Sequence, residues 1–310
     1  WPPMSTAAAD RPPSIDPVAA RRWAGRPHDS SPWLHEEVAR RMAERLELIR
    51  LPVRAWADWE PARGGLRGHE RVIAQYPDAQ CFRVSVQHQQ APEAPKKIAT
   101  GWWQRLRGGR AGATDVVQPP DASVQLVWAN MLAHQVAEPT ALMADWLRAL
   151  AVDGFVMFSC LGPDTLRELR ALYADLGWPP PAHEFTDLHD WGDQLLGAGF
   201  ADPVMDMERI TLSFASPERL LQELRGLGRN LHAQRFAGLR TPAWRERLHA
   251  AMARRLASAA DGGALTLSVE DVYGHAVKPP PRHTIAAQTT ISLDDLKVSL
   301  RQRNRNLPSV

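Results

Sequence analysis

Apolar residues recur along this chain with two different periods. One set is spaced four, four, four and three residues apart, which predicts a helix over residues 31–49 with this apolar face: Leu34, Val38, Met42, Leu46 and Ile49. Short apolar runs rich in β-branched and aromatic residues predict strands, at 52–59, 81–86, 124–130, 154–161, 203–214 and 264–278. The run at 154–161, "GFVMFSCL", is apolar throughout, as in a strand buried on both faces of a parallel sheet.

Further helices are predicted between and after these strands. Helices at 138–150 and 187–200 separate three of the strands. Ser216-Pro217 begins another helix that ends at Gly228, and Thr241-Pro242 begins the next, because a Ser or Thr N-cap followed by Pro is typical of a helix start. Strands that alternate with helices predict an α/β fold with a doubly wound sheet.

The same pattern predicts one folded domain over residues 21–280. Residues 1–20 are expected to be a disordered N-terminus, and residues 281–310 a C-terminal tail. The stretch 87–112 is rich in Pro, Gly and charge and is too long for an ordinary connection in such a fold, so it is interpreted as an insertion.

Composition narrows the classes of partner. The formal net charge is +2, which gives no support to nucleic-acid binding. No stretch reaches about 18 consecutive apolar residues, so membrane insertion is not expected. The only two cysteines, Cys81 and Cys160, lie in apolar runs, and Cys160 is interpreted as a packed, inert thiol. A cytoplasmic protein is therefore expected, while the oligomeric state stays open.

Three segments carry a resemblance to a known family. "GPDTLREL", "LGAGFADPVMDME" and "LTLSVEDVYGHAVKP" are similar to stretches of the BioC family, the malonyl-acyl-carrier-protein O-methyltransferases of biotin synthesis. The similarity extends over residues 23–278. It implies a class I methyltransferase fold: a Rossmann-like, seven-stranded mixed sheet whose last strand is antiparallel, with S-adenosylmethionine as cofactor. Helices within 216–257 would then form a cap over the substrate entrance.

The resemblance places the cofactor site at the turn after the first strand. Asp58 is retained, Gly64 matches the last glycine of the motif, and Gly65 adjoins it. Glu60 and Ala62 stand where the family has glycines, which bring backbone close to a ligand and tolerate positive φ.

The acidic residue that would accept hydrogen bonds from the cofactor's ribose is also replaced. Ser85 stands at that position, at the end of the second strand. Glu60 is expected to bring negative charge toward the carboxylate of the cofactor. On this interpretation, Glu60→Gly together with Ser85→Asp strengthens cofactor affinity.

Other candidate residues follow strands of the same sheet. Asn130 ends the strand at 124–130 and is a candidate cofactor-binding residue. Gly162 and Asp164 follow the strand at 154–161, at an edge where α/β folds bind ligands, and are candidate substrate-side residues, although a plain strand-to-helix turn explains them equally well. His28 replaces a tyrosine of the family and is a third substrate-side candidate. No residue stands out as catalytic.

One cluster resembles a metal site. "HEFTDLHDWGD" contains His189 and Asp193 at the i, i+4 spacing that metal ligands on a helix use. Asp187, however, is a natural N-cap, and the other acidic residues suit the first turn of a helix. A structural helix without a metal is therefore predicted.

Two functions remain open. The first is methylation of the free carboxylate of malonyl-acyl carrier protein; this transfer needs little acid-base help because a carboxylate is already a nucleophile. The second is a catalytically inactive relative that serves as a binding or assembly protein, which the substitutions at Glu60, Ala62 and Ser85 favour. The basic insertion with Trp102 and Trp103 is interpreted as a solvated loop, and docking of an acidic carrier protein there is the alternative.

Overall fold

A seven-stranded sheet organises the chain. The computed structural model describes residues 14–27, 30–85, 113–258 and 262–281. Contacts divide the chain into Trp1–Pro279 and Pro280–Val310, and the description below concerns the first unit. The order in the sheet is β3-β2-β1-β4-β5-β7-β6. The strands are β1 (Ala55–Trp59), β2 (Gln80–Val84), β3 (Ala113–Val116), β4 (Val124–Ala129), β5 (Leu150–Leu161), β6 (Ala201–Phe214) and β7 (Leu265–Val277).

Strand directions confirm the predicted mixed sheet. β1 pairs in parallel with both β2 and β4, and β7 runs antiparallel to its neighbours β5 and β6. The strand order reverses between β1 and β4. Side-by-side strands whose connections leave in opposite directions open a crevice at their carboxyl ends, which is where doubly wound folds bind ligands. Four-residue β3 was not predicted.

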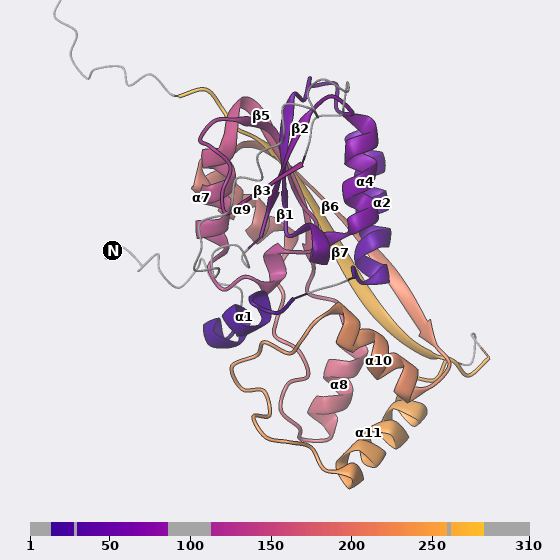
Figure 1. Ribbon diagram of the computed structural model, residues 1–310. Coiled ribbons are helices and arrows are strands. Elements are labelled where there is room, and N and C mark those ends of the chain that lie inside the picture. Colours follow the sequence, from indigo (N-terminus) through magenta and orange to yellow (C-terminus); the bar gives the residue numbers. More distant parts are fainter. Residues whose placement is uncertain (1–13, 28–29, 86–112, 259–261, 282–310) are drawn as a thin grey trace, which may run out of the picture. The chain divides into compact units, whose positions relative to one another are not determined.

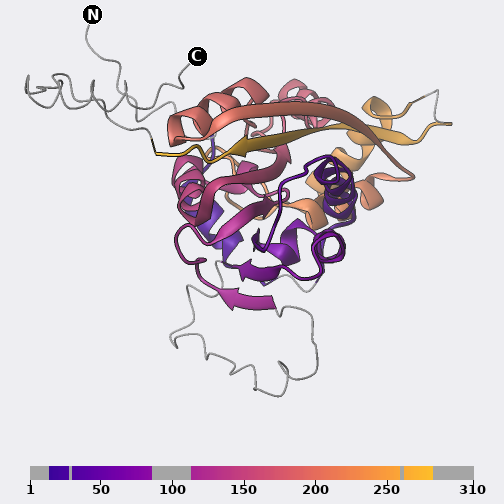
Figure 2. The ribbon, with the colours of Figure 1, turned by 90° about the horizontal axis from the view of Figure 1, so that it is seen from above.

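Helices cover both faces of the sheet (Figures 1 and 2). α2 (Trp33–Leu46) and α4 (Leu66–Gln75) lie on one face, and α7 (Pro139–Ala149) and α9 (Leu188–Ala198) on the other. The predicted apolar face of α2 is confirmed, since Leu34, Val38, Met42 and Leu46 are all buried. Asp187 caps α9 as predicted, accepting a hydrogen bond from the His189 amide.

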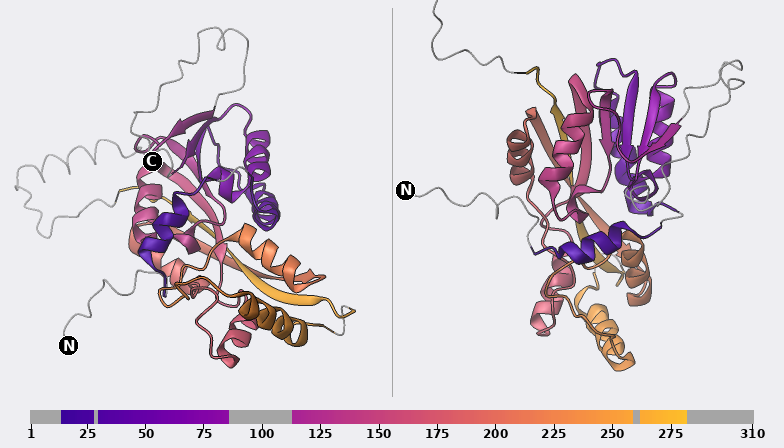
Figure 3. Two further views of the ribbon diagram at one scale, coloured as in Figure 1. Left: turned by 60° about the horizontal axis from the view of Figure 1, so that its bottom comes forward. Right: turned by 60° about the vertical axis from the view of Figure 1, so that its left-hand side comes forward.

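Three helices form a separate group beyond one end of the sheet (Figures 1 and 3). α10 (Pro217–Leu227) and α11 (Pro242–Arg255) begin where the sequence predicts, because Ser216 and Thr241 accept hydrogen bonds from the amides of Arg219 and Trp244. α8 (Arg167–Asp175), which follows β5, joins them and contacts α11. We call α8, α10 and α11 the cap helices.

The folded part begins earlier than predicted. α1 (Pro17–Ala24) starts inside the segment expected to be disordered, capped by the Asp16 side chain. Asp16 also pairs with Arg235 at 2.7 Å, and the Asp16 amide donates to Leu231 O at 2.7 Å. Buried Trp23 adds apolar contact. These contacts order residues that have no strong pattern of their own.

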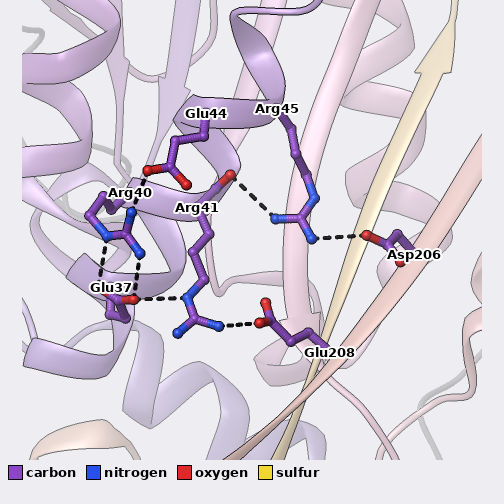
Figure 4. Close-up of polar contacts among 7 residues, drawn as sticks. All are labelled: Glu37, Arg40, Arg41, Glu44, Arg45, Asp206 and Glu208. Carbon is purple, nitrogen blue, oxygen red and sulfur yellow. Dashed lines mark hydrogen bonds and ion pairs between the residues drawn. The ribbon is translucent and has the colours of Figure 1, made fainter.

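A network of charged residues connects α2 to edge strand β6 (Figure 4). Arg41 bridges Glu37 of α2 and Glu208 of β6, while Arg45 pairs with Asp206 at 2.9 Å. Hydrogen bonds from Arg40 and Arg41 lower the pKa of the Glu37 carboxyl to about 2. The Glu37 carboxylate therefore keeps its charge over the whole physiological pH range.

A buried carboxyl lies close to this network. Asp271 of β7 has 0% exposure, and neither of its oxygens has a hydrogen-bond partner among the described residues. Burial raises its pKa to about 7, against a smaller opposing effect of Arg41 and a further rise from Glu208 and Glu270. The folded protein therefore holds this proton more tightly than the unfolded chain does.

Replacing Asp271 with Asn is expected to stabilise the protein selectively at high pH. The pKa of Asp271 is higher in the folded protein than in the unfolded chain. Its ionisation therefore lowers the stability of the parent protein as pH rises from about 4 to about 7, and above that pH it lowers the stability no further. An amide does not ionise, so Asp271→Asn should gain about 2–4 kcal/mol at pH 8 and little at pH 4. Urea unfolding at both values measures this; an equal effect at both would contradict it.

Candidate functional site

The turn after β1 has the backbone conformation of a glycine turn. Glu60 has φ 59° and ψ 54°, in the left-handed region, and Gly65 has φ 137°. Between them lies the short helix α3 (Pro61–Gly64). A side chain in the left-handed region costs about 1–2 kcal/mol. The turn thus keeps its shape although one of its glycines is replaced by Glu60.

The Glu60 side chain is directed toward the end of β2. The backbone amide of Glu60 donates to Val84 O at 2.8 Å, and the Ser85 hydroxyl lies 3.4 Å from Glu60 Oε2. The carboxylate is buried, with the Arg63 Nε 3.9 Å away. The Glu60 carboxylate thus lies beside Ser85 at the end of β2. That it brings negative charge toward the carboxylate of the cofactor stays a prediction.

Arg63 connects the turn to the N-terminal helix. Its guanidinium donates to Trp23 O at 2.7 Å and Arg26 O at 3.3 Å, and also to Ala24 O. These carbonyls lie at the carboxyl end of α1, where the helix dipole favours a cation. The Arg63 Nε is buried without a hydrogen bond among the described residues. Burial lowers the pKa of Arg63.

Three of the predicted cofactor residues hold the turn in place. Asp58 is buried and lies 2.6 Å from His69 Nδ1, which joins β1 to α4. A Cβ on Gly64 would lie 2.8 Å from Asn130 O, so only glycine fits there. The Asn130 amide donates to His35 O at 2.8 Å and to Gly64 O, and accepts from Ser159 Oγ at 2.6 Å.

The predicted substrate-side residues lie at the end of β5. Gly162 N donates to Glu270 O at 2.8 Å, and Asp164 N donates to Glu270 Oε2 at 3.1 Å. The Asp164 carboxylate also pairs with Arg209. Neither Gly162 nor Asp164 lines the cavity described next, whereas their neighbour Thr165 does. His28 lies outside the described residues.

A cavity of about 240 Å³ lies between the sheet edge and the cap helices. Most of its wall is apolar, and Leu34 and His35 of α2, Met131 after β4, and Leu221 of α10 contribute to it. His35 Nδ1 lies 2.7 Å from Arg63 O, so the cavity borders the turn after β1. The cavity thus lies next to the switch point of the sheet.

Two histidines in the cavity wall are held neutral. Burial lowers the pKa of His134 well below its usual value and that of His183 to about 4. His183 Nε2–H donates to His134 O at 2.8 Å, which leaves Nδ1 as an acceptor. That Nδ1 is buried and has no partner among the described residues. It can accept a hydrogen bond from a ligand N–H or O–H.

The cavity also has a cationic rim. Arg229 lines the cavity, with its guanidinium 5.2 Å from the ring centre of Trp23. The Arg63 guanidinium lies 5.4 Å from the same ring. Burial and the nearby charges of Arg26 and Arg225 lower the pKa of Arg229, and its hydrogen bonds go to backbone carbonyls. An anionic group entering here would find a cation without a carboxylate partner among the described residues.

Comparison with known proteins finds curated relatives that share one name, malonyl-acyl-carrier-protein O-methyltransferase. A malonyl-acyl-carrier-protein O-methyltransferase of Gallionella capsiferriformans is 36% identical over 262 residues, which cover 82% of this chain and 87% of the relative. One of Halorhodospira halophila is 38% identical over 257 residues, covering 80% and 82%. No family model matches. Among solved structures, the YcgJ protein of Bacillus subtilis aligns over 77% of this chain and 98% of its own, with 10% identity and a TM-score of 0.48.

Replacing Arg63 with Met is expected to destabilise the protein. The change removes the Arg63 cation that lies 3.9 Å from the buried Glu60 carboxylate and the hydrogen bonds that Arg63 donates to three carbonyls, and losing one partner of a buried pair costs about 3–5 kcal/mol. Arg63→Met combined with Glu60→Gln should cost clearly less, because no buried charge is then left. Chemical denaturation of the two variants and the parent measures this, and equal losses in both would show that Glu60 and Arg63 are not coupled.

Proposed function

Because the chain belongs to the malonyl-acyl-carrier-protein O-methyltransferase family, we propose that it methylates the free carboxylate of malonyl-acyl carrier protein, with S-adenosylmethionine as donor, in biotin synthesis. The observation that carries this proposal is the cavity that borders the turn after β1. The cavity would take the acceptor, and the turn beside it, with the Glu60 carboxylate, would hold the cofactor. Residues 21–280 would form the catalytic domain, with 216–257 as part of the cap.

The chemistry of the side chains at the turn fits the cofactor. Glu60 supplies, from the end of β1, the carboxylate that Ser85 does not supply at the end of β2. We infer that Glu60 and Ser85 bind the ribose hydroxyls. Asp58, Gly64, Gly65 and Asn130 would act by shaping the turn. The bound cofactor supplies an electrophilic methyl group on a sulfonium.

The cavity suits a carboxylate nucleophile. Arg229 can pair with the free carboxylate and orient it, while the apolar wall removes water from it. No general base is needed, and His134 and His183, both neutral, compete with Arg229 neither as cations nor as acids. Positioning and desolvation would therefore supply most of the rate.

The cap has the charge expected for an acidic protein partner. Residues 216–258 contain nine arginines and three glutamates, whereas the whole chain carries only +2. A basic surface beside the cavity would steer an acidic acyl carrier protein toward it. Among the residues that the structure describes, every helix is too short or too polar to cross a membrane. A cytoplasmic location follows from the proposed substrate.

The alternative of an inactive binding protein depends on the loss of the turn glycines. Since Glu60 retains the left-handed conformation and directs its carboxylate to β2, this loss does not by itself remove a cofactor site. No observation in the described residues favours the alternative over methyl transfer.

Glu60→Gly distinguishes the two interpretations of the turn. If Glu60 merely obstructs the cofactor, this variant binds more tightly. If Glu60 binds the ribose, removing charge-assisted hydrogen bonds worth about 1.5–3 kcal/mol each should weaken binding tenfold or more. We expect weakening, with recovery when Ser85→Asp is added. Isothermal titration with S-adenosylhomocysteine, at a temperature at which each variant is folded, measures it.

Methyl transfer tests the proposed activity directly. The purified full chain, S-adenosylmethionine and malonyl-acyl carrier protein should give the methyl ester, detected by mass spectrometry, and acetyl-acyl carrier protein, which lacks a free carboxylate, should give none. Arg229→Gln should raise KM for malonyl-acyl carrier protein by about tenfold while leaving the affinity for S-adenosylhomocysteine unchanged. Tight cofactor binding without any transfer to malonyl-acyl carrier protein would refute the proposed acceptor.

A further inference from the structure

A second cavity lies within the cap. Its volume is about 450 Å³, and it is lined by residues of all three cap helices and the segment before α11. The residues that matter here are Tyr173, Leu221, Arg225, Arg240, Trp244 and Arg245. Three arginines thus face one cavity that the malonyl site does not require.

These arginines have no carboxylate partner among the described residues. Other cap arginines are neutralised: Arg219 pairs with Glu223, and Arg255 with Asp175. Arg240 instead lies over aromatic rings, with its guanidinium 3.6 Å from the ring centre of Phe236 and 4.2 Å from that of Trp244. Ring contacts orient a guanidinium without cancelling its charge. The cap cavity is therefore a concentrated positive site with an oriented donor.

The cap cavity adjoins the 240 Å³ cavity beside the turn after β1, which we call the inner cavity. Tyr173, Leu221 and Arg225 line both of them, so the two share a wall. Arginines line the cap cavity, whereas the other cavity has a mostly apolar wall that includes His183, whose buried Nδ1 has no partner among the described residues. A ligand that spans both would carry an anion at its outer end and amide N–H groups along an otherwise neutral chain.

We propose that the cap cavity binds the phosphate of the phosphopantetheine arm that carries the malonyl thioester. Arg240 and Arg245 hold the phosphate, and the arm passes Arg225 and Tyr173 into the inner cavity, where His183 Nδ1 accepts a hydrogen bond from one of its amides. This deepens the proposed function and rests on it for the identity of the thioester. The phosphate site itself depends only on the geometry of the cap.

Binding of phosphopantetheine and of pantetheine, which differ only in the phosphate, tests the site without catalysis. Isothermal titration should show that the parent protein binds phosphopantetheine at least about tenfold more tightly, as expected for charge-assisted hydrogen bonds. The preference should disappear in Arg240→Ala/Arg245→Ala. Arg254→Ala removes an exposed charge from α11, the helix of Arg245, outside the cavity and should keep the preference.

Equal affinity of the parent protein for the two ligands would overturn the proposal, and this comparison needs no variant to fold. A preference that survives in Arg240→Ala/Arg245→Ala would also overturn it, because the phosphate would then bind elsewhere. Failure of methyl transfer would refute the proposed function but leave the binding result to decide the phosphate site.

Where transfer occurs, kinetics separates the two sources of a phosphorylated arm. Malonyl-acyl carrier protein and malonyl-coenzyme A both carry the phosphate. A lower KM for the carrier protein, raised several-fold in the double variant, supports the carrier arm as the ligand. Methylation of malonyl-coenzyme A alone would overturn that assignment.

Discussion

The candidate site depends on a buried arginine in the turn after β1. Arg63 donates to carbonyls at the end of α1, its own carbonyl meets His35 of α2, and its side chain lies beside the Glu60 carboxylate. A guanidinium buried to this degree must find acceptors, since an uncompensated charge in a low-dielectric environment costs several kcal/mol. The N-terminal helix, the turn and α2 are therefore placed together by one requirement. Gly64 and Asn130 then bring the same turn against β4.

Local patterns in the sequence predict most of the sheet and its helices. The spacing of apolar residues and the helix caps act within a few residues, so α2, α9, α10 and α11 begin close to the residues at which they are predicted to begin. Local patterns do not predict the elements that are held in place by contacts with residues distant in sequence. α1 depends on Asp16 and Arg235, which are far apart in sequence, and α8 contacts α11 and β7, both of which are distant from it in sequence.

The site was harder to predict for the same reason. Strand ends identify Asp58, Ser85 and Asn130 as residues of one sheet edge, but not the direction of their side chains. Asp58 and Asn130 point into buried hydrogen bonds, while Glu60, expected to obstruct, lies beside Ser85. The signal that was available is the conformation required at Glu60: a left-handed residue at the end of β1 sends its side chain toward β2. Arg63, Trp23 and the cavity histidines carry no local signal, because their roles exist only once α1, the turn and the cap are assembled.

The distribution of charge around the two cavities gives the substrate a direction. The inner cavity has an apolar wall and neutral histidines, which suit the uncharged length of a prosthetic arm. Cations lie at separate places: Arg229 beside Trp23 and the turn, and Arg240 and Arg245 in the cap. An arm with a carboxylate at one end and a phosphate at the other would pair with Arg229 and with the cap arginines at once. In the reversed orientation the carboxylate would not lie beside the turn, and the thioester would not lie in the inner cavity. Because burying an unpaired anion is costly, this spacing of cations would, on the proposed binding mode, favour the orientation in which the carboxylate lies beside the turn after β1 with little water around it. Partial loss of its hydration is also what makes that carboxylate a better nucleophile, so the same arrangement that orients the substrate promotes the transfer.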